Sequence, residues 1–196
     1  MANWIGTYRC QERFIRKPLL VSRNPLWFTD YQSPMTPTIF QLEQLPCLYR
    51  LVIGAEHLDR LGHMNVRHYI AIFDDSAWRF FATFGLDEAY YASGQGGGFS
   101  LQQSVRYLAE CRVGDVITVR ARMLGRSVRR SHFMLFMVNE SSGVLAATLE
   151  TLVSHADLKI RRTSPYPAHI AAQIDAILDE HQALDWEAPV CGVIRP

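Results

Sequence analysis

The stretch DRLGHMNVRHY, from Asp59 to Tyr69, holds the residues of this chain whose types and spacing are best suited to catalysis. It places a carboxylate, a glycine, a histidine and the helix-capping residue Asn65 just before an apolar helical pattern. The start of a helix presents unpaired N–H groups and the positive end of the helix dipole. A substrate carbonyl directed there would have its developing oxyanion stabilised by backbone donors.

Each polar residue of this stretch has a candidate role in that chemistry. The backbone N–H groups of Asn65 and Val66 are the expected oxyanion donors. Gly62 lets the loop turn tightly and lets a substrate approach the backbone. Asp59 would act on the carbonyl carbon, either as a nucleophile or as a general base toward water. His63 would orient Asp59 or polarise the carbonyl, although packing or hydrogen bonding alone would also explain a histidine here.

The same residues also fit a purely structural interpretation. Loops that precede helices are rich in Asp, Gly and Asn because these residues cap and turn. Tyr69 lies one turn into the helix, where it either packs in the core or contacts substrate. Asp74 and Asp75, further along the helix, are alternative positions for the acid. The residue types alone therefore leave catalysis and capping both open.

Composition and charge narrow the class of protein. The chain has 196 residues, 48% of them hydrophobic and 20% charged, which is typical of one globular domain with appendages. A net charge of +1 argues against nucleic acid or an acidic membrane as partner. No apolar run approaches the roughly 20 residues of a membrane span. The four cysteines form no C-x-x-C pair, which favours reduced thiols in the cytoplasm and indicates neither a disulfide framework nor a metal site. No cofactor is indicated.

The first 34 residues are basic and interrupted by prolines, with few acids. This composition fits a mobile arm, a targeting peptide, or translated sequence ahead of a true start at Met35. We expect three parts: a partly irregular N-terminal arm at 1–46, a globular domain at 47–162 that contains the candidate catalytic stretch, and a C-terminal extension with a helix at 163–196.

Hydrophobic periodicity predicts one long helix, which begins after Asn65, is apolar along one side and ends at Gly85. The segment SGQGGGFS at 93–100 is expected to be a flexible connection. A second, amphipathic helix is predicted over 168–182. Five strands are predicted, at 47–54, 99–108, 115–124, 132–138 and 144–155. The last four are expected to form an antiparallel meander in a sheet that curls around the long helix.

A known family carries a motif that resembles the stretch DRLGHMNVRHYIAIFDD. In hotdog enzymes of the 4-hydroxybenzoyl-CoA thioesterase type, an Asp stands three residues before Gly-His-apolar-Asn, followed on the helix by a Tyr, an aromatic and an acidic residue. The subgroup associated with carnitine and betaine metabolism is the most similar. The likeness spans roughly residues 48–182. It implies an α+β hotdog fold, an antiparallel curved sheet wrapped around one long buried helix, plus a C-terminal helix.

The resemblance also implies an activity and a site. It implies that the chain is an acyl-CoA thioesterase, with Asp59 as the catalytic carboxylate and the helix-start amides near Asn65 and Val66 polarising the carbonyl. It implies a homodimer or tetramer with the pocket at the subunit interface. Arg161 and Arg162 are candidates for the phosphates of coenzyme A. Two other functions are kept: a non-catalytic acyl-CoA-binding hotdog protein, and hydration of an enoyl-CoA.

Overall fold

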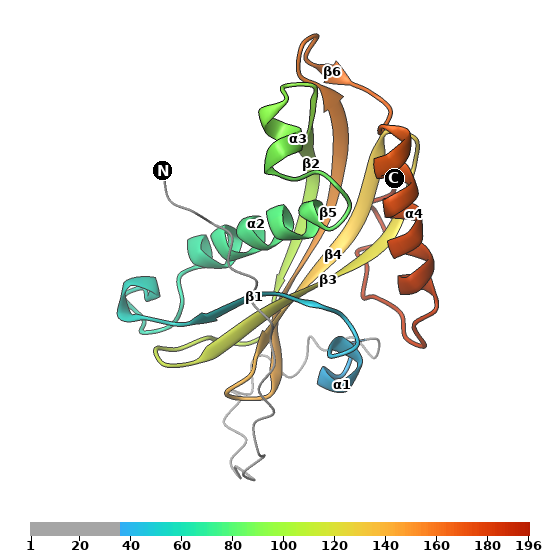
Figure 1. The fold of residues 1–196 in the computed structure, drawn as a ribbon. Helices are drawn as coiled ribbons and strands as arrows, with labels where there is room; N and C mark the ends of the chain where they lie inside the picture. The colour runs from blue at the N-terminus through green and yellow to red at the C-terminus, as the bar shows by residue number, and fades with distance from the viewer. Residues whose placement is uncertain (1–35) are drawn as a thin grey trace.

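A computed structural model describes residues 36–196 of the chain (Figure 1). Residues 1–35, on which the predictions of an arm, a targeting peptide or a later start mainly fall, lie outside the described residues. Within the described range, no helix is both long and apolar enough to cross a bilayer.

One antiparallel sheet forms the body of the protein, and its strands follow the order β1-β3-β4-β5-β2. The long helix α2 (Val66–Ala82) lies in the hollow of the curled sheet (Figure 1). The predicted helix and the five predicted strands are therefore confirmed, with somewhat different bounds. The strands are β1 (Cys47–Val52), β2 (Gly96–Tyr107), β3 (Val116–Arg126), β4 (Arg130–Asn139) and β5 (Val144–Asp157), and the short β6 (Arg162–Thr163) pairs with β5.

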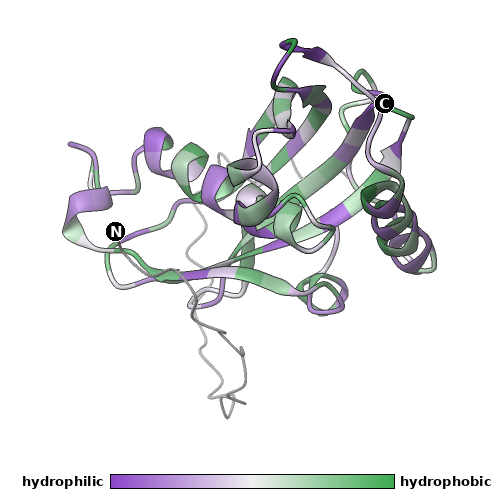
Figure 2. Ribbon diagram, turned by 45° about the horizontal axis from the view of Figure 1, so that its top comes forward, coloured by the Kyte–Doolittle hydropathy of each residue, from purple (hydrophilic) through white to green (hydrophobic). Residues whose placement is uncertain are grey.

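Local sequence explains where α2 begins and ends. The side chain of Asn65 caps the helix by accepting a hydrogen bond of 3.1 Å from the N–H of Arg67. Gly85, with φ +90°, lies just beyond the other end, in a conformation that favours glycine. Hydrophobic and hydrophilic residues alternate along the helix (Figure 2), so that one side is buried against the sheet. The buried residues are Tyr69, Ile72, Phe73, Ser76, Ala77, Phe80 and Phe81.

The predicted meander is wrong in one respect. Strands β3, β4 and β5 follow one another in the sheet, but β2 pairs with β5 and lies at the opposite edge from β1. Residues 108–115 are therefore a crossing and not a tight turn. The N–H groups of Leu108 and Ala109 both donate to the carbonyl of Ala146, which keeps the start of this crossing against β5.

The prediction of a flexible connection at 93–100 is also wrong, because β2 already begins at Gly96. The preceding helix α3 (Glu88–Ala92), which was not predicted, lies over the start of this strand. Tyr90 of α3 makes a hydrogen bond of 2.7 Å between its hydroxyl and Nε2 of His155. A Cβ atom on Gly96 would come within 2.6 Å of the same nitrogen. The glycines therefore leave room for the α3 side chains.

The outer face of the sheet is covered by the two ends of the described chain. Helix α1 (Ile39–Leu42) and the segment around Trp186 pack there in a second apolar cluster. Arg122 on β3 donates to the carbonyl of Trp186, and its guanidinium lies 4.3 Å from the centre of the indole.

The predicted C-terminal helix is confirmed as α4 (Ala168–Gln182), which packs along β3.

Candidate active site

The loop that carries the motif connects β1 to α2 and is fixed at both of its ends. It begins with one turn of 3-10 helix, η2 (Ala55–His57), and closes on itself through a bridge between Leu58 and Met64. The N–H of Met64 donates to the carbonyl of Cys111 in the crossing that follows β2. The crossing therefore holds the loop at the start of α2.

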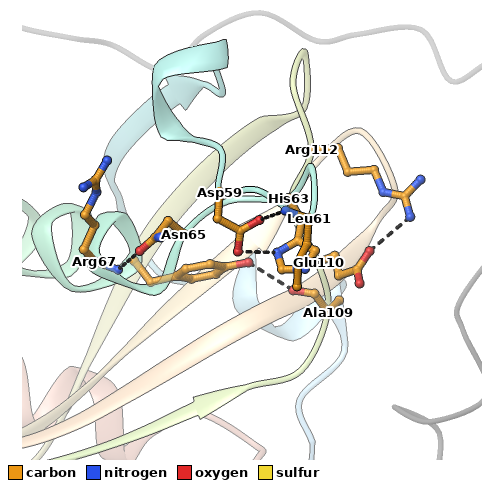
Figure 3. Close-up of polar contacts among 9 residues, drawn as sticks. Asp59, Leu61, His63, Asn65, Arg67, Ala109, Glu110 and Arg112 are labelled. Atoms are coloured by element: carbon orange, nitrogen blue, oxygen red, sulfur yellow. Dashed lines mark hydrogen bonds and ion pairs between the residues drawn. The ribbon is translucent and has the colours of Figure 1, made fainter.

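Asp59 and His63 face each other across this loop (Figure 3). The Oδ2 atom of Asp59 lies 3.4 Å from Nδ1 of His63, and its Oδ1 atom accepts a hydrogen bond of 2.8 Å from the N–H of Leu61. The two side chains are 23% and 30% exposed, so solvent or a substrate can reach both. Gly62 has φ +83° at the turn, as its predicted role requires.

The start of α2 leaves one backbone donor available. Of the two amides predicted to stabilise an oxyanion, the N–H of Asn65 is engaged, because it donates to the carbonyl of His57 at 2.9 Å. The N–H of Val66 has no acceptor among residues 36–196. Val66 is 59% exposed and begins the helix, so its N–H is the donor that remains for a carbonyl oxygen.

A broad hollow of about 660 Å³ opens beside these groups. Asp59 and Asn65 border it, together with two arginines, Arg60 and Arg67, that sequence reasoning passed over as binding residues. Both arginines belong to the motif itself, where Arg60 directly follows Asp59 and Arg67 lies in the first turn of the predicted helix, and this position was the available signal. Their charges make the hollow attractive to an anion such as a phosphate group.

Tyr69 lies in the core and not in the hollow. Its hydroxyl donates to the carbonyl of Ala109 at 3.3 Å, and its ring packs edge-to-face against Tyr107 with the ring centres 5.2 Å apart. Burial raises the pKa of the Tyr69 hydroxyl far above its usual value. Tyr69 was expected either to pack in the core or to contact substrate, and its placement supports packing in the core.

Arg161 and Arg162 lie at the other end of β2 from the motif. Arg161 extends its guanidinium to 5.9 Å from the centre of the Phe99 ring, whereas Tyr69 of α2 packs on Tyr107. At about 3.3 Å per residue, Phe99 and Tyr107 are roughly 26 Å apart along the strand. A single chain therefore does not bring these arginines together with Asp59.

The two acids on α2 lie in different surroundings. Asp74 lines a cavity of about 110 Å³ between α2 and strands β2, β4 and β5. Asp75 instead lies near Tyr49 and contributes to raising the pKa of that tyrosine, after the larger effect of burial. Within residues 36–196, no three His, Cys, Asp or Glu side chains are grouped in a way that could hold a metal ion.

Residues 53–174 match the thioesterase-like superfamily. The chain belongs to this superfamily. It is 28% identical over 133 residues to an L-carnitine dehydrogenase/betainyl-CoA thioesterase of Rhizobium meliloti, which covers 68% of this chain but only 27% of that longer relative. It is 26% identical over 153 residues to a betainyl-CoA thioesterase of Pseudomonas aeruginosa, with 78% of this chain and 96% of that protein covered.

Solved structures share the fold. A Staphylococcus aureus protein determined in complex with CoA superimposes with a TM-score of 0.69 and 25% identity, covering 78% of this chain and 96% of its own. A 1,4-dihydroxy-2-naphthoyl-CoA thioesterase of Synechocystis gives a TM-score of 0.58 at 16% identity, covering 65% and 93%. The hotdog fold and the family expected from the motif are therefore confirmed.

Proposed function

We propose that this member of the superfamily hydrolyses an acyl-CoA thioester to the free acid and coenzyme A, with Asp59 as the catalytic carboxylate. The observation that carries the proposal is the pairing of two groups in one accessible loop. A partly exposed carboxylate lies in the turn that precedes α2, and the unbonded N–H of Val66 stands at the helix start. One supplies a base or nucleophile, and the other supplies a fixed donor for the developing oxyanion.

Two chemical routes use these groups. In the first, the Asp59 carboxylate attacks the carbonyl carbon, the C–S bond breaks, and CoA leaves as a thiolate that takes up a proton. Water then hydrolyses the resulting mixed anhydride and restores the carboxylate. In the second route, Asp59 accepts a proton from water as that water attacks the carbonyl. The C–S bond of the tetrahedral intermediate then breaks, and the leaving CoA thiolate takes up a proton, which restores the Asp59 carboxylate. In both routes the N–H of Val66 donates to the carbonyl oxygen, and His63 keeps the carboxylate in place.

The complete site is proposed to form between two copies of the chain. Among the described residues, β2 pairs only with β5, so one edge of this long strand is open for pairing with a second copy. Exposed apolar side chains on β2 and α2 are expected for a surface that is buried in a dimer. They are Phe99, Leu101 and Tyr107 on β2, and Ile70 and Trp78 on α2.

Antiparallel pairing of β2 with the same strand of a second copy would bring Asp59 of one chain toward Arg161 and Arg162 of the other. Centred on the middle of the strand, such pairing sets the Gly96 end of one chain opposite the partner's Tyr107. The partner's Asp59 loop would then approach the end of β2 where Arg161 lies over Phe99. This arrangement gives Arg161 and Arg162 a role in holding the CoA phosphates beside a carboxylate from the other subunit.

The proposed acyl group and location in the cell rest on the named relatives and on the cysteines. Two relatives are named as acting on betainyl-CoA, which makes a betainyl group the first acyl group to test. Cys111 and Cys191 form no disulfide within residues 36–196. Free thiols and a CoA substrate both favour the cytoplasm as the place where the enzyme works.

The test is thiol release from a panel of short, long, aromatic and betainyl CoA thioesters, with the wild type and Asp59→Asn compared. Asp59→Asn keeps the shape of the side chain and removes its charge. We expect turnover to fall by about two to four orders of magnitude while substrate binding persists. Tight binding in both proteins with no turnover of any thioester would instead establish a non-catalytic acyl-CoA-binding protein.

A further inference from the structure

One turn of the crossing that follows β2 contacts both ends of the segment that carries the candidate site. This crossing turn, residues 111–115, passes beside the Asp59 loop (Figure 3). Where β1 leads into the loop, the N–H of Ile53 donates to the carbonyl of Asp115 at 2.8 Å. Where the loop leads into α2, the N–H of Met64 donates to the carbonyl of Cys111 at 2.7 Å. The crossing turn therefore fixes the start and the end of the loop together.

Met64 is the point at which the loop closes on itself. It forms a bridge with Leu58, and in the next pair of residues the N–H of Asp59 donates to the carbonyl of His63 at 2.9 Å. The bridge that Cys111 holds is thus the neighbour of the pair that sets Asp59 opposite His63. The start of α2 is supported separately, because it has its own side-chain cap. A displacement of Cys111 would therefore act first on the position of the Asp59 carboxylate.

The carboxylate of Asp115 fixes the shape of the crossing turn. Its Oδ2 atom accepts a hydrogen bond of 2.8 Å from the N–H of Arg112 and one of 2.7 Å from Nδ2 of Asn139. Asn139 is 1% exposed at the end of β4, and its Oδ1 atom accepts a hydrogen bond of 3.2 Å from the N–H of Ser142. The turn is thereby attached to the sheet. Removing the carboxylate takes the acceptor away from a buried donor, which is costly, so the turn should move.

Buried side chains attach the same crossing to α2. The hydroxyl of Tyr69 donates to the carbonyl of Ala109 at 3.3 Å. The side chain of Cys111 is fully buried and lies beside Tyr69 and Asn139. Burial raises the pKa of the Cys111 thiol to about 11, so the thiol stays uncharged at neutral pH and packs as a small apolar group. The crossing is therefore held between α2 and the end of β4.

We propose that Asp115, held by Asn139, is a positioning residue for the Asp59 carboxylate. Neither Asp115 nor Asn139 borders the hollow beside Asp59, so neither touches a substrate bound there. Their effect reaches Asp59 through the carbonyl of Cys111 and the backbone of Met64. The kinetic effects rest on the thioesterase function proposed above, whereas the position of Asp59 can be measured without it.

The kinetic test uses the CoA thioester that the wild type hydrolyses fastest. Asp115→Ala should lower kcat about 10- to 100-fold and change KM less than about threefold, because a small misplacement of a reacting group mainly slows the chemical step. Asp115→Asn keeps an oxygen that can accept from both donors and should restore kcat to within about threefold. Asp175→Ala is the matched control. It removes a carboxylate that accepts two hydrogen bonds from Arg126, at the opposite end of β3, and should leave kcat unchanged.

Combining Asp115→Ala with Asp59→Asn separates positioning from general damage to the fold. If Asp115 acts through the Asp59 carboxylate, its removal should lower the residual activity of Asp59→Asn by less than about threefold. Equal 10- to 100-fold losses in both backgrounds would overturn the positioning role and leave Asp115 with a structural role only.

A spectroscopic measurement tests the position of Asp59 without any turnover. In protein with isotope-labelled histidine, the imidazole NMR signal of His63 senses the Asp59 charge 3.4 Å away, and Asp59→Asn gives the direction of its shift. Asp115→Ala should move the signal in that direction. Asn139→Ala, which removes the contact from the β4 side, should do the same, and Asp175→Ala should not. Such a shift without hydrolysis of any thioester would sink the thioesterase and keep the positioning role. An unmoved signal in both Asp115→Ala and Asn139→Ala would overturn the positioning role, even in an active enzyme.

Discussion

His63 and Asp59 are joined twice, once by their side chains and once by their backbones. Nδ1 of His63 lies 3.4 Å from Oδ2 of Asp59, and the N–H of Asp59 donates to the carbonyl of His63 at 2.9 Å. The backbone bond fixes the turn without help from the imidazole. We therefore propose a separate task for the imidazole, which is to hold the carboxylate in one orientation.

Replacing His63 by Ala should lower kcat about 10- to 100-fold with a small change in KM, the usual range for losing a group that positions another. The loop itself should persist, because its backbone bonds remain. Steady-state kinetics and thermal unfolding measure the two effects separately. His169→Ala, on the exposed side of α4, is the control for loss of a histidine. A large fall in Tm with kcat unchanged would give His63 a structural role only.

The unfolding free energy should decrease below pH about 6.5 because of buried neutral histidines. Burial lowers the pKa of His181, whose Nδ1 accepts a hydrogen bond of 2.8 Å from the N–H of Met123. The unfolded chain then binds more protons than the folded one between the ordinary histidine pKa and the lowered one. The contribution of His181 to the unfolding free energy is therefore complete above the ordinary histidine pKa. It decreases as the pH falls from that pKa toward the lowered pKa of the folded protein.

Urea unfolding at a series of pH values between 5 and 8 measures this slope. His181→Asn keeps an acceptor for the N–H of Met123 but does not titrate, so its stability should depend less on pH than that of the wild type. His155, whose pKa is also lowered by burial, would still contribute a slope of the same sign. An unchanged slope in His181→Asn would contradict the assignment.

The sequence was sufficient to predict α2 and the strands, because a helix or strand that is buried on one side has apolar residues at a regular spacing along the sequence. It was also sufficient for the Asp59 loop, whose capping and turning residues define the helix start. Strand order was not accessible in the same way. Residues 108–115 contain a Gly-Asp pair typical of a turn, and nothing local shows that the chain crosses the sheet before β3.

The errors at the glycines and at the helix-start amides have a common cause. Gly96 lies in a strand because Tyr90 and His155 occupy the space beside it, and those residues are distant in sequence. The N–H of Asn65 is engaged by the carbonyl of His57, a contact that depends on how the loop closes. In each case a long-range partner determines the local role, and a single sequence does not display its partners.

Trp186 should be a main contributor to the stability of the outer face of the sheet. Its indole packs on Phe136 and Arg122, and its Nε1 donates to the side chain of Gln44 at 3.0 Å. Trp186→Ala should cost about 3–5 kcal/mol of unfolding free energy, as large-to-small changes at buried tryptophan do. Val193→Ala changes an exposed residue of the same segment and should alter stability by less than about 0.5 kcal/mol. A loss for Trp186→Ala as small as that expected for Val193→Ala, measured by denaturant unfolding, would mean that the Trp186 contacts do not stabilise the sheet.

Two variants on separate chains should restore activity if the site is shared between subunits. Asp59→Asn removes the carboxylate, and Ala77→Leu fills the cavity beside α2, where we expect the acyl group to lie, so each homodimer should be nearly inactive. In a heterodimer of the two variants, one site combines an intact Asp59 loop with an intact cavity. We expect such heterodimers, co-expressed with two tags and purified through both, to show about half of the wild-type kcat per dimer.

The reciprocal heterodimer decides between a shared site and a site within one chain. When both substitutions lie on one chain and the other chain is wild type, each shared site contains one defect, so the dimer should be nearly inactive. Sites contained within single chains would reverse both results: the doubly substituted heterodimer would keep half of its activity, and the singly substituted one would have none. Because the two heterodimers contain the same two substitutions, a difference in their activity reports the arrangement of the site and not the damage done by either change.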